Sequence, residues 1–154
     1  MKSYREINQK IKSIEKVYRQ KIKGNDYFGF VITLDNNENI KILQEQTCLC
    51  CEEYDVIILT PFYEDDPNID EKKQMKGAYV NGVGWGKKIE EDFHNQLELK
   101  KINIKPNENK EFYCHVDLIS DKGLFQIVCY NFHNGNYTHN IYVEWKDFTD
   151  LEHL

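Results

Sequence analysis

The sequence predicts an α+β fold in which an N-terminal helix packs on a mainly antiparallel sheet of about six or seven strands. Three observations lead to this prediction. Residues 1–24 follow a helical apolar period, the residues from 26 onward alternate with the period of a strand, and turn residues separate the strand-like segments. The 154 residues suit a single domain, made of a basic N-terminal helix at 1–24 and a β-rich body at 26–148.

Charge is divided unequally between these two parts. Residues 1–24 hold eight basic and two acidic side chains, whereas the other 130 residues hold twelve basic and twenty-four acidic ones. The net charge of −6 therefore averages a basic helix and an acidic body. Because the acidic segment 52–71 can match the charges of the helix, the outward surface should be acidic, and we expect a protein partner with a basic surface.

Composition also indicates where the protein works. Hydrophobic residues make up 40% of the chain, enough for a core, and no apolar run approaches the ~20 residues of a membrane span. The N-terminus is charged and lacks the apolar stretch of a signal peptide. Five cysteines cannot all pair within one chain, which fits free thiols in a reducing compartment. We therefore expect a cytoplasmic protein that makes no membrane contact.

The first element is expected to be a basic amphipathic helix over residues 3–22. Ser3 and Glu6 have the spacing of a capping box, and Gly24-Asn25 suits the end of the helix. The apolar residues recur with 3-4-3-4 spacing and form one stripe: Tyr4, Ile7, Ile11, Ile14 and Tyr18. The stripe leaves two arrangements open, because the helix can pack on its own sheet or form the seam of a homodimer.

Alternating apolar residues follow the helix and predict a pair of strands. The residues that should share one face of the first strand, over 26–34, are Phe28, Phe30, Ile32 and Leu34. Three polar residues at 35–37 form a turn, and a return strand begins at 40–43. This part of the chain should therefore form a hairpin with one buried face.

The middle of the chain gives shorter elements. Residues 54–60 form a β-branched run that suits a buried strand, and 77–86 hold four glycines that suit a bulged strand. A short helix is expected over 87–96 and a further strand over 97–104. Segment 52–71 carries eight carboxylates and no basic side chain, and its loop is interpreted as solvated or as an acidic contact surface.

Two hairpins are expected near the C-terminus. The Asn-Gly pair at 134–135 suits both central positions of a type I′ turn, and its register pairs 124–132 with 137–145. The Asp-Lys-Gly sequence at 121–123 suits a three-residue loop, which pairs 112–118 with the same central strand. The apolar faces of both hairpins coincide in these registers, so a three-stranded meander is predicted.

The meander would leave one polar face that could hold a ligand. By these registers its polar side chains are Tyr113, His115, Asp117, Cys129, Asn131, His133, Thr138, Asn140 and Tyr142. Aromatic and amide groups suit a flat polar ligand, such as a nucleotide base or a peptide. The residues expected to bind it are Tyr113, His115, Asn131, His133, Asn140 and Tyr142. A wetted or helix-covered sheet face is the alternative explanation of the same residues.

A catalytic interpretation of this face rests on His115, Cys129 and Asp117. The expected register places His115 directly across from Cys129, where an imidazole can convert a thiol into a nucleophilic thiolate. Asp117 lies on the same face and would orient the imidazole. We prefer a non-catalytic role for this face, because amphipathic sheets commonly carry such polar residues.

No cofactor is expected from the sequence. Cys48, Cys50 and Cys51 form a CxCC cluster, which lacks the paired spacing of a structural zinc site and has no second pair of ligands. They are the residues that would hold a metal if one were bound, and small buried thiols are the preferred explanation. The four glycines of 77–86 match no phosphate-binding loop.

An ordered set of short motifs resembles a family of small phage and bacterial proteins that has no known activity. The motifs are Cys50-Cys51-Glu52, Gly77-Ala78, the sequence GLFQ at 123–126 and the sequence YNFHNGNYTH at 130–139. The similar region spans about residues 45–145, and its most specific part is the terminal hairpin, where Asn136 replaces an aromatic residue. The resemblance implies a phage or prophage accessory protein.

The function expected first is that of a small non-enzymatic binding or accessory protein of phage or mobile-element origin. Such a protein would modulate a host defence protein or sequester a small ligand. The first alternative is a Cys/His-dependent or metal-assisted hydrolase that uses the polar sheet face. The second is nucleic-acid binding through the basic helix, which the acidic body and the scarcity of arginine disfavour.

Overall fold

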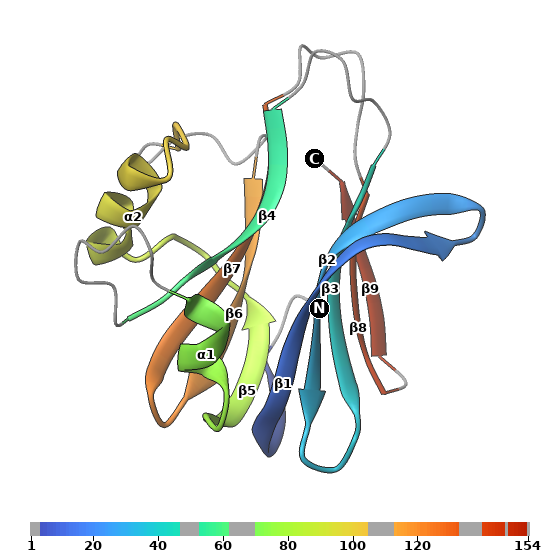
Figure 1. Cartoon of the computed structure of the whole chain (residues 1–154), viewed down its shortest axis with the longest axis vertical. Helices are drawn as coiled ribbons and strands as arrows, with labels where there is room; N and C mark the ends of the chain where they lie inside the picture. The colour runs from blue at the N-terminus through green and yellow to red at the C-terminus, as the bar shows by residue number, and fades with distance from the viewer. Residues whose placement is uncertain are drawn as a thin grey trace.

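The computed structural model describes residues 4–46, 53–61, 70–104, 113–132, 140–146 and 148–153. These residues form nine antiparallel strands, more than the six or seven predicted, in two sheets that face each other (Figure 1). The elements in chain order are β1 (Arg5–Ile22), β2 (Asn25–Leu34), β3 (Asn39–Glu45), β4 (Glu53–Leu59), α1 (Glu71–Met75), β5 (Tyr79–Trp85), η1 (Glu91–Phe93), α2 (His94–Leu99), β6 (Tyr113–Ser120), β7 (Gly123–Phe132), β8 (Asn140–Trp145) and β9 (Phe148–His153). Neither helix of this described part is long and apolar enough to cross a membrane.

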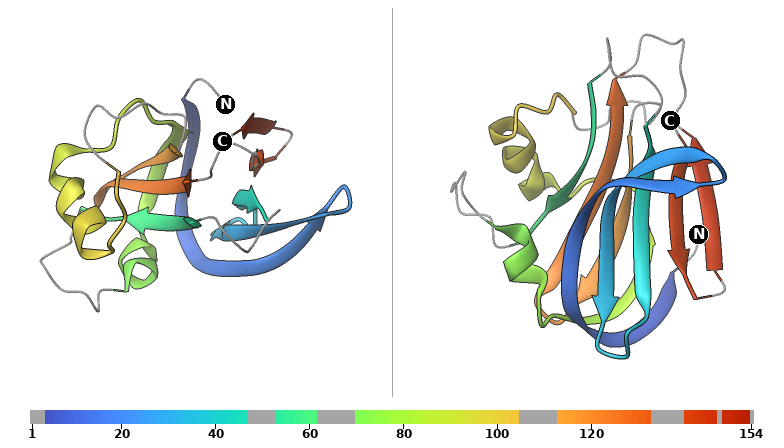
Figure 2. Two further views of the ribbon diagram at one scale, coloured as in Figure 1. Left: turned by 90° about the horizontal axis from the view of Figure 1, so that it is seen from above. Right: turned by 45° about the vertical axis from the view of Figure 1, so that its right-hand side comes forward.

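The long strand β1 belongs to both sheets. Its residues 5–10 pair with β5, and its residues 11–22 pair with β2. The strand order is therefore continuous, β4-β7-β6-β5-β1-β2-β3-β8-β9, and β1 curves from one sheet into the other (Figure 2). A register shift between Ile11 and Ser13 lies at this passage, as bulges commonly do where a strand changes sheets.

The helix predicted over 3–22 is wrong, because this segment is β1. Ile7 and Ile11 are both buried, and residues four apart share a face in a strand as well as in a helix. The backbone at Asn8 has a φ of 54° within a second register shift, so β1 is a bulged strand. Tyr18, the last residue of the expected stripe, is 77% exposed. The prediction of a homodimer seam depended on this helix, so the structure gives it no support.

Several other strands lie where they were predicted. β2 and β3 pair in the expected hairpin, with Phe30 opposite Ile42. β4 is the strand expected at 54–60, and β5 is irregular, with a register shift between Val80 and Gly82. These elements were recognisable because each is defined by local alternation, turn residues or glycines.

The segment after β5 agrees with the sequence only in its first half. The short helix expected over 87–96 is present as η1 and α2. The strand expected over 97–104 is wrong, because α2 continues to Leu99 and no strand follows it before the end of this described range. Ile102 and Ile104 alternate as a strand would, but both side chains are buried in a cluster with α2.

The C-terminal meander is present only in part. β6 and β7 form the first hairpin, but a two-residue turn shifts their register by one residue, so that Cys114 faces Cys129 and His115 faces Val128. The second predicted pairing is wrong, because β7 pairs with β4 while β8 pairs with β3 and β9 in the other sheet. The turn predicted at 134–135 lies outside the described residues.

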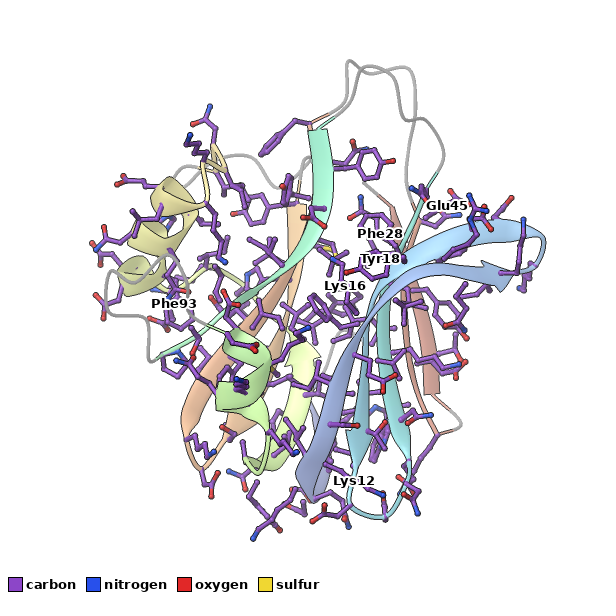
Figure 3. All side chains as sticks on the ribbon, in the orientation of Figure 1. Lys12, Lys16, Tyr18, Phe28, Glu45 and Phe93 are labelled. Atoms are coloured by element: carbon purple, nitrogen blue, oxygen red, sulfur yellow. The ribbon has the colours of Figure 1, made fainter. Side chains whose placement is uncertain are left out.

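Two buried clusters hold the elements together. The larger fills the space between the sheets with residues from both, among them Phe30, Ile42 and Ile127. The smaller lies on the other side of β7, where Phe93 and Leu97 of the η1–α2 segment pack (Figure 3). β7 is therefore buried on both faces, and a polar residue on β7 faces a core whichever way it points.

Candidate functional site

A pocket lies where the tip of the β1–β2 hairpin meets β8 and β9. Its volume is about 250 Å³, just below the ~300–1,000 Å³ that is common for ligand pockets. The lining residues come from segments far apart in the sequence: Ile22, Lys23, Asn25, Tyr27, Asn140, Tyr142 and Thr149. The pocket is thus large enough for one small molecule, and its shape depends on the fold of the second sheet.

One wall of the pocket is the end of the β1–β2 hairpin, residues 17–27, here called the arm. Ile22 and Asn25 pair across its tip, and Lys23 and Gly24 form the turn with φ values of 50° and 87°. A type I′ turn requires this left-handed backbone at both positions. The arm projects from the body on the side of β8 and β9 (Figure 1). Its exposed Lys23 lines the pocket.

Two tyrosines form the aromatic part of the pocket. Tyr27 on β2 and Tyr142 on β8 lie on either side of β3, and their rings meet edge to face with centroids 6.2 Å apart. Burial raises the pKa of Tyr27 above its ordinary value of 10.0, a hydrogen bond with Asn140 opposes this effect, and the charge of Glu45 adds to it. Tyr27 is only 4% exposed and therefore forms a fixed, neutral surface.

The hydroxyl of Tyr142 is also held by its neighbours. It donates a hydrogen bond to Glu144 and forms another with Thr149 on β9. Burial raises the pKa of Tyr142, and Glu144 raises it further, because a phenolate would face a second negative charge. Glu45, at the base of the arm (Figure 3), and Glu144 thus place carboxylates beside the tyrosines, whereas Lys23 places a cation at the rim.

The structure divides the predicted ligand-binding residues among different surroundings. Two of them line the pocket: Asn140 and Tyr142. Tyr113 and His115 are buried in the other sheet, on the side that carries α2. Asn131 is buried and alternates with residues that face the space between the sheets, and His133 lies outside the described residues. The single polar face predicted from the meander is therefore wrong.

The arm residues of the pocket were absent from the prediction. Gly24 and Asn25 were interpreted as the end of a helix, so Lys23 and Tyr27 were assigned to two unconnected elements. The signal that could have found them is Lys23-Gly24 itself, since glycine at the second position of a two-residue turn is typical of a hairpin. The signal was missed because the apolar residues of the preceding segment have helix-like spacing, so Gly24 was interpreted as a helix end.

His115, a catalytic candidate, belongs to a buried hydrogen-bond network. Its Nδ1 lies 3.0 Å from Oδ1 of Asp117, a contact that the sequence suggested. Gln126 donates to the same Asp117 oxygen at 2.9 Å and to the Lys88 carbonyl at 3.1 Å, and it accepts from the Glu90 amide at 2.9 Å. His115 is 1% exposed, and its Nε2 has no partner among the described residues. This network fixes the loop after β5 and presents no accessible imidazole.

Cys129, the candidate nucleophile, lies on the opposite face of the sheet from His115. It faces Cys114 and is fully buried in the cluster between the sheets. A hydrogen bond with Cys114, together with burial, raises the pKa of the Cys129 thiol well above its ordinary value of 9.0. The predicted His115–Cys129 pair is wrong, because the one-residue shift in register turns the two side chains to different sides.

Asn131 and Gln44 form a polar layer at one end of the core between the sheets. Gln44 reaches from β3 across to β7 and donates a hydrogen bond to the Tyr130 carbonyl at 3.2 Å. Oε1 of Gln44 and both polar side-chain atoms of Asn131, Oδ1 and Nδ2, are buried without a partner within the described part of the chain.

The metal candidates Cys48, Cys50 and Cys51 lie outside the described residues, as do residues 62–69 of the acidic segment. Within the described ranges, no three His, Cys, Asp or Glu side chains are grouped so that they could hold a metal ion. The pocket beside the arm is therefore the feature on which a functional argument can be built.

Comparisons with known proteins add no assignment. No family model, no curated protein and no solved structure matches the chain. The resemblance to a phage protein family stays a prediction from the sequence.

Proposed function

We propose that this chain is a small non-enzymatic binding protein that takes up a small polar molecule in the pocket beside the arm. The observation that carries the proposal is a preformed pocket lined by two tyrosines, two asparagines and a lysine. Aromatic surface combined with a few fixed polar groups is typical of ligand sites. Because Tyr27 and Tyr142 are already held by hydrogen bonds, a ligand would lose little affinity to ordering them.

The chemistry of the pocket favours binding over catalysis. The pKa values of Tyr27 and Tyr142 are raised, so neither ring supplies a phenolate near neutral pH. The hydrolase alternative is weakened further because His115 and Cys129 do not meet and Cys129 keeps its proton. Sequestration of a small molecule is therefore the mode we favour.

The wider predictions from the sequence belong to this proposal. A phage or mobile-element accessory protein gains from binding a small molecule without converting it, because sequestration alone removes the molecule from solution. Modulation of a host defence protein through the acidic surface is the second candidate, and the excess of acidic residues outside 1–24 supports it. We favour sequestration because the pocket is a defined site with known lining residues, whereas no particular binding site is identified on the acidic surface of the described residues.

A fragment screen on the full chain tests the proposal. Small polar aromatic compounds should change the NMR signals of Tyr27 and Tyr142, and Asn140→Ala should weaken the binding. Asn39→Ala is the matched control, because Asn39 is an exposed β3 asparagine that bonds Thr33 and does not line the pocket. Binding that Asn140→Ala and Asn39→Ala weaken equally, or a screen in which no compound perturbs the two tyrosines, would refute the proposal.

A further inference from the structure

We propose that the ligand of the pocket is a free nucleoside monophosphate, with its base against Tyr142 and its phosphate beside Lys23. The inference rests on the proposed function and adds the chemical class of the ligand. It follows from the order in which charged, amide and aromatic groups are placed around a pocket of about 250 Å³.

The aromatic wall suits a nucleobase. Tyr142 is partly exposed and lines the pocket, while the edge of its neighbour Tyr27 supports it at a centroid distance of 6.2 Å. Stacking of a base on an aromatic side chain is worth ~1–3 kcal/mol and tolerates any base. The hydroxyl of Tyr142 donates a hydrogen bond to Glu144, which restrains the ring.

The polar groups beside the rings match the edge of a base. Asn25 and Asn140 line the pocket, and each amide can both donate and accept a hydrogen bond. Base edges present ring nitrogens, carbonyls and amino groups side by side, so two amides that can both donate and accept complement them.

The rim suits a phosphate. Lys23 sits on the two-residue turn and is the charged residue among those that line the pocket. Arg19 and Lys21 lie on the same arm and are largely exposed, and both form ion pairs with Asp26, at 3.4 Å and 3.0 Å. The arm thus holds three basic side chains against one acidic one, which leaves it positively charged beside an otherwise acidic body. A phosphate would be drawn to this end of the pocket.

Size and charge favour a free mononucleotide over a nucleic acid. A pocket of about 250 Å³ has room for one base and little more. Residues 25–154 carry twice as many acidic as basic side chains, so a polyanion that extended beyond the arm would be repelled. A single phosphate at Lys23 would remain beside the positive arm and avoid this repulsion.

The experiment is calorimetric titration of the full chain with the four ribonucleoside 5′-monophosphates, the corresponding nucleosides, inorganic phosphate and a single-stranded octanucleotide. At least one monophosphate should bind, its nucleoside about tenfold more weakly, and phosphate alone not detectably. Lys23→Met should weaken the monophosphate about tenfold and leave the nucleoside unchanged. Lys73→Met is the matched control, because Lys73 is an exposed lysine on α1.

A second pair of variants separates the base from the phosphate. Tyr142→Leu should weaken nucleoside and monophosphate alike, by about tenfold or more, since it removes the stacking surface. Tyr142→Phe keeps the ring and should bind within a few-fold of the unchanged chain, which provides a test even if the leucine variant does not fold.

Two results would overturn the inference while leaving the proposed function intact. One is a nucleoside that binds as tightly as its monophosphate with no effect of Lys23→Met. The other is a panel that gives no binding while the fragment screen still finds ligands at Tyr27 and Tyr142. Tighter binding of the octanucleotide than of any monophosphate would overturn it in favour of nucleic acid, and failure of both the panel and the fragment screen would remove the proposed function as well.

Discussion

Lys16 connects β1 of one sheet with β4 of the other, and its substitution tests how much this contact stabilises the fold. It extends from β1 to the edge strand β4, where its Nζ donates to Asp55 Oδ1 at 3.2 Å and to the Val56 carbonyl at 3.1 Å. The same ammonium lies 4.7 Å from the ring centre of Phe30 and 5.6 Å from that of Phe28 (Figure 3). A single side chain therefore joins an edge of one sheet to the inner aromatic residues of the other.

The free energy that the Lys16 contacts contribute to stability can be estimated from the individual interactions. The ion pair with Asp55, which is 45% exposed, contributes at most ~1 kcal/mol because solvent screens it. The hydrogen bond to the Val56 carbonyl and the contact with the two rings contribute ~1 kcal/mol each. Ordering a long lysine side chain costs up to ~1.5–2 kcal/mol in rotamer entropy, but a methionine in its place would lose a comparable amount. We therefore expect Lys16→Met to lower the free energy of unfolding by about 2 kcal/mol.

Thermal and urea unfolding of the full chain measure this effect. For a chain of this size a loss of about 2 kcal/mol lowers the melting temperature by roughly 4–8 °C. Lys12→Met is the matched control, because Lys12 is an exposed lysine on the same strand with one hydrogen bond, to Asn37 at 3.1 Å, and should cost less than ~0.5 kcal/mol. An equal loss of stability in the two variants would show that the contacts of Lys16 with β4 and the aromatic rings do not stabilise the fold.

Further expectations concern the backbone, the tyrosines and the buried thiol. Gly29→Ala should destabilise the chain by more than ~3 kcal/mol, because φ is +150° and an added Cβ would collide with a carbonyl of β3. Gly24→Ala, at a φ of +87° with open space around it, should cost only ~1 kcal/mol. Similar urea midpoints for the two variants would contradict this expectation. The raised pKa values of Tyr27 and Tyr142 mean that their stabilising effect is complete below pH 10, the ordinary value, and is lost as pH rises through the folded-state values. The urea midpoint should therefore fall above pH ~10, and less steeply in the double Tyr→Phe variant; an unchanged slope would refute the assignment. Cys129 should resist a maleimide at pH 8 in the folded chain and react after unfolding, as read by peptide mass mapping, and rapid labelling of the native chain would contradict its burial.

Local signals in the sequence were sufficient for some strands. The β2–β3 hairpin was predictable because its alternating residues and its polar turn are adjacent in the chain, and the two strands pair as a hairpin with Phe30 opposite Ile42. The same reasoning gave the position of β4, whose apolar run is short and β-branched. Each of these elements depends on residues within a few positions of one another.

The first strand could not be predicted because two periods agree at its buried positions. Ile7 and Ile11 are four residues apart, which satisfies one helix face and also one strand face. Only the partner β5, about 70 residues away, decides between them. The same limit applies to β8, whose hairpin signal gave no information about which sheet it would join.

The site was predictable in part for the same reason. Asn140 and Tyr142 were identified because they alternate on β8, whatever strand lies beside it. Their pocket partners Asn25 and Tyr27 come from the other end of the chain, and no local pattern connects them with β8. A single misplaced residue in the β6–β7 turn was enough to pair His115 with the wrong neighbour.

The position of β1 also has a consequence for synthesis on the ribosome. Residues 5–10 are made well before β5, the strand they pair with, which begins at Tyr79. At ~5–20 residues per second, the intervening ~70 residues take roughly 4–14 s to translate. During that interval this part of the nascent chain presents an unpaired edge, to which another nascent chain on the same message could add. Its charged residues Arg5, Glu6 and Lys10 oppose such pairing, so charge protects the chain until its own partner strand emerges.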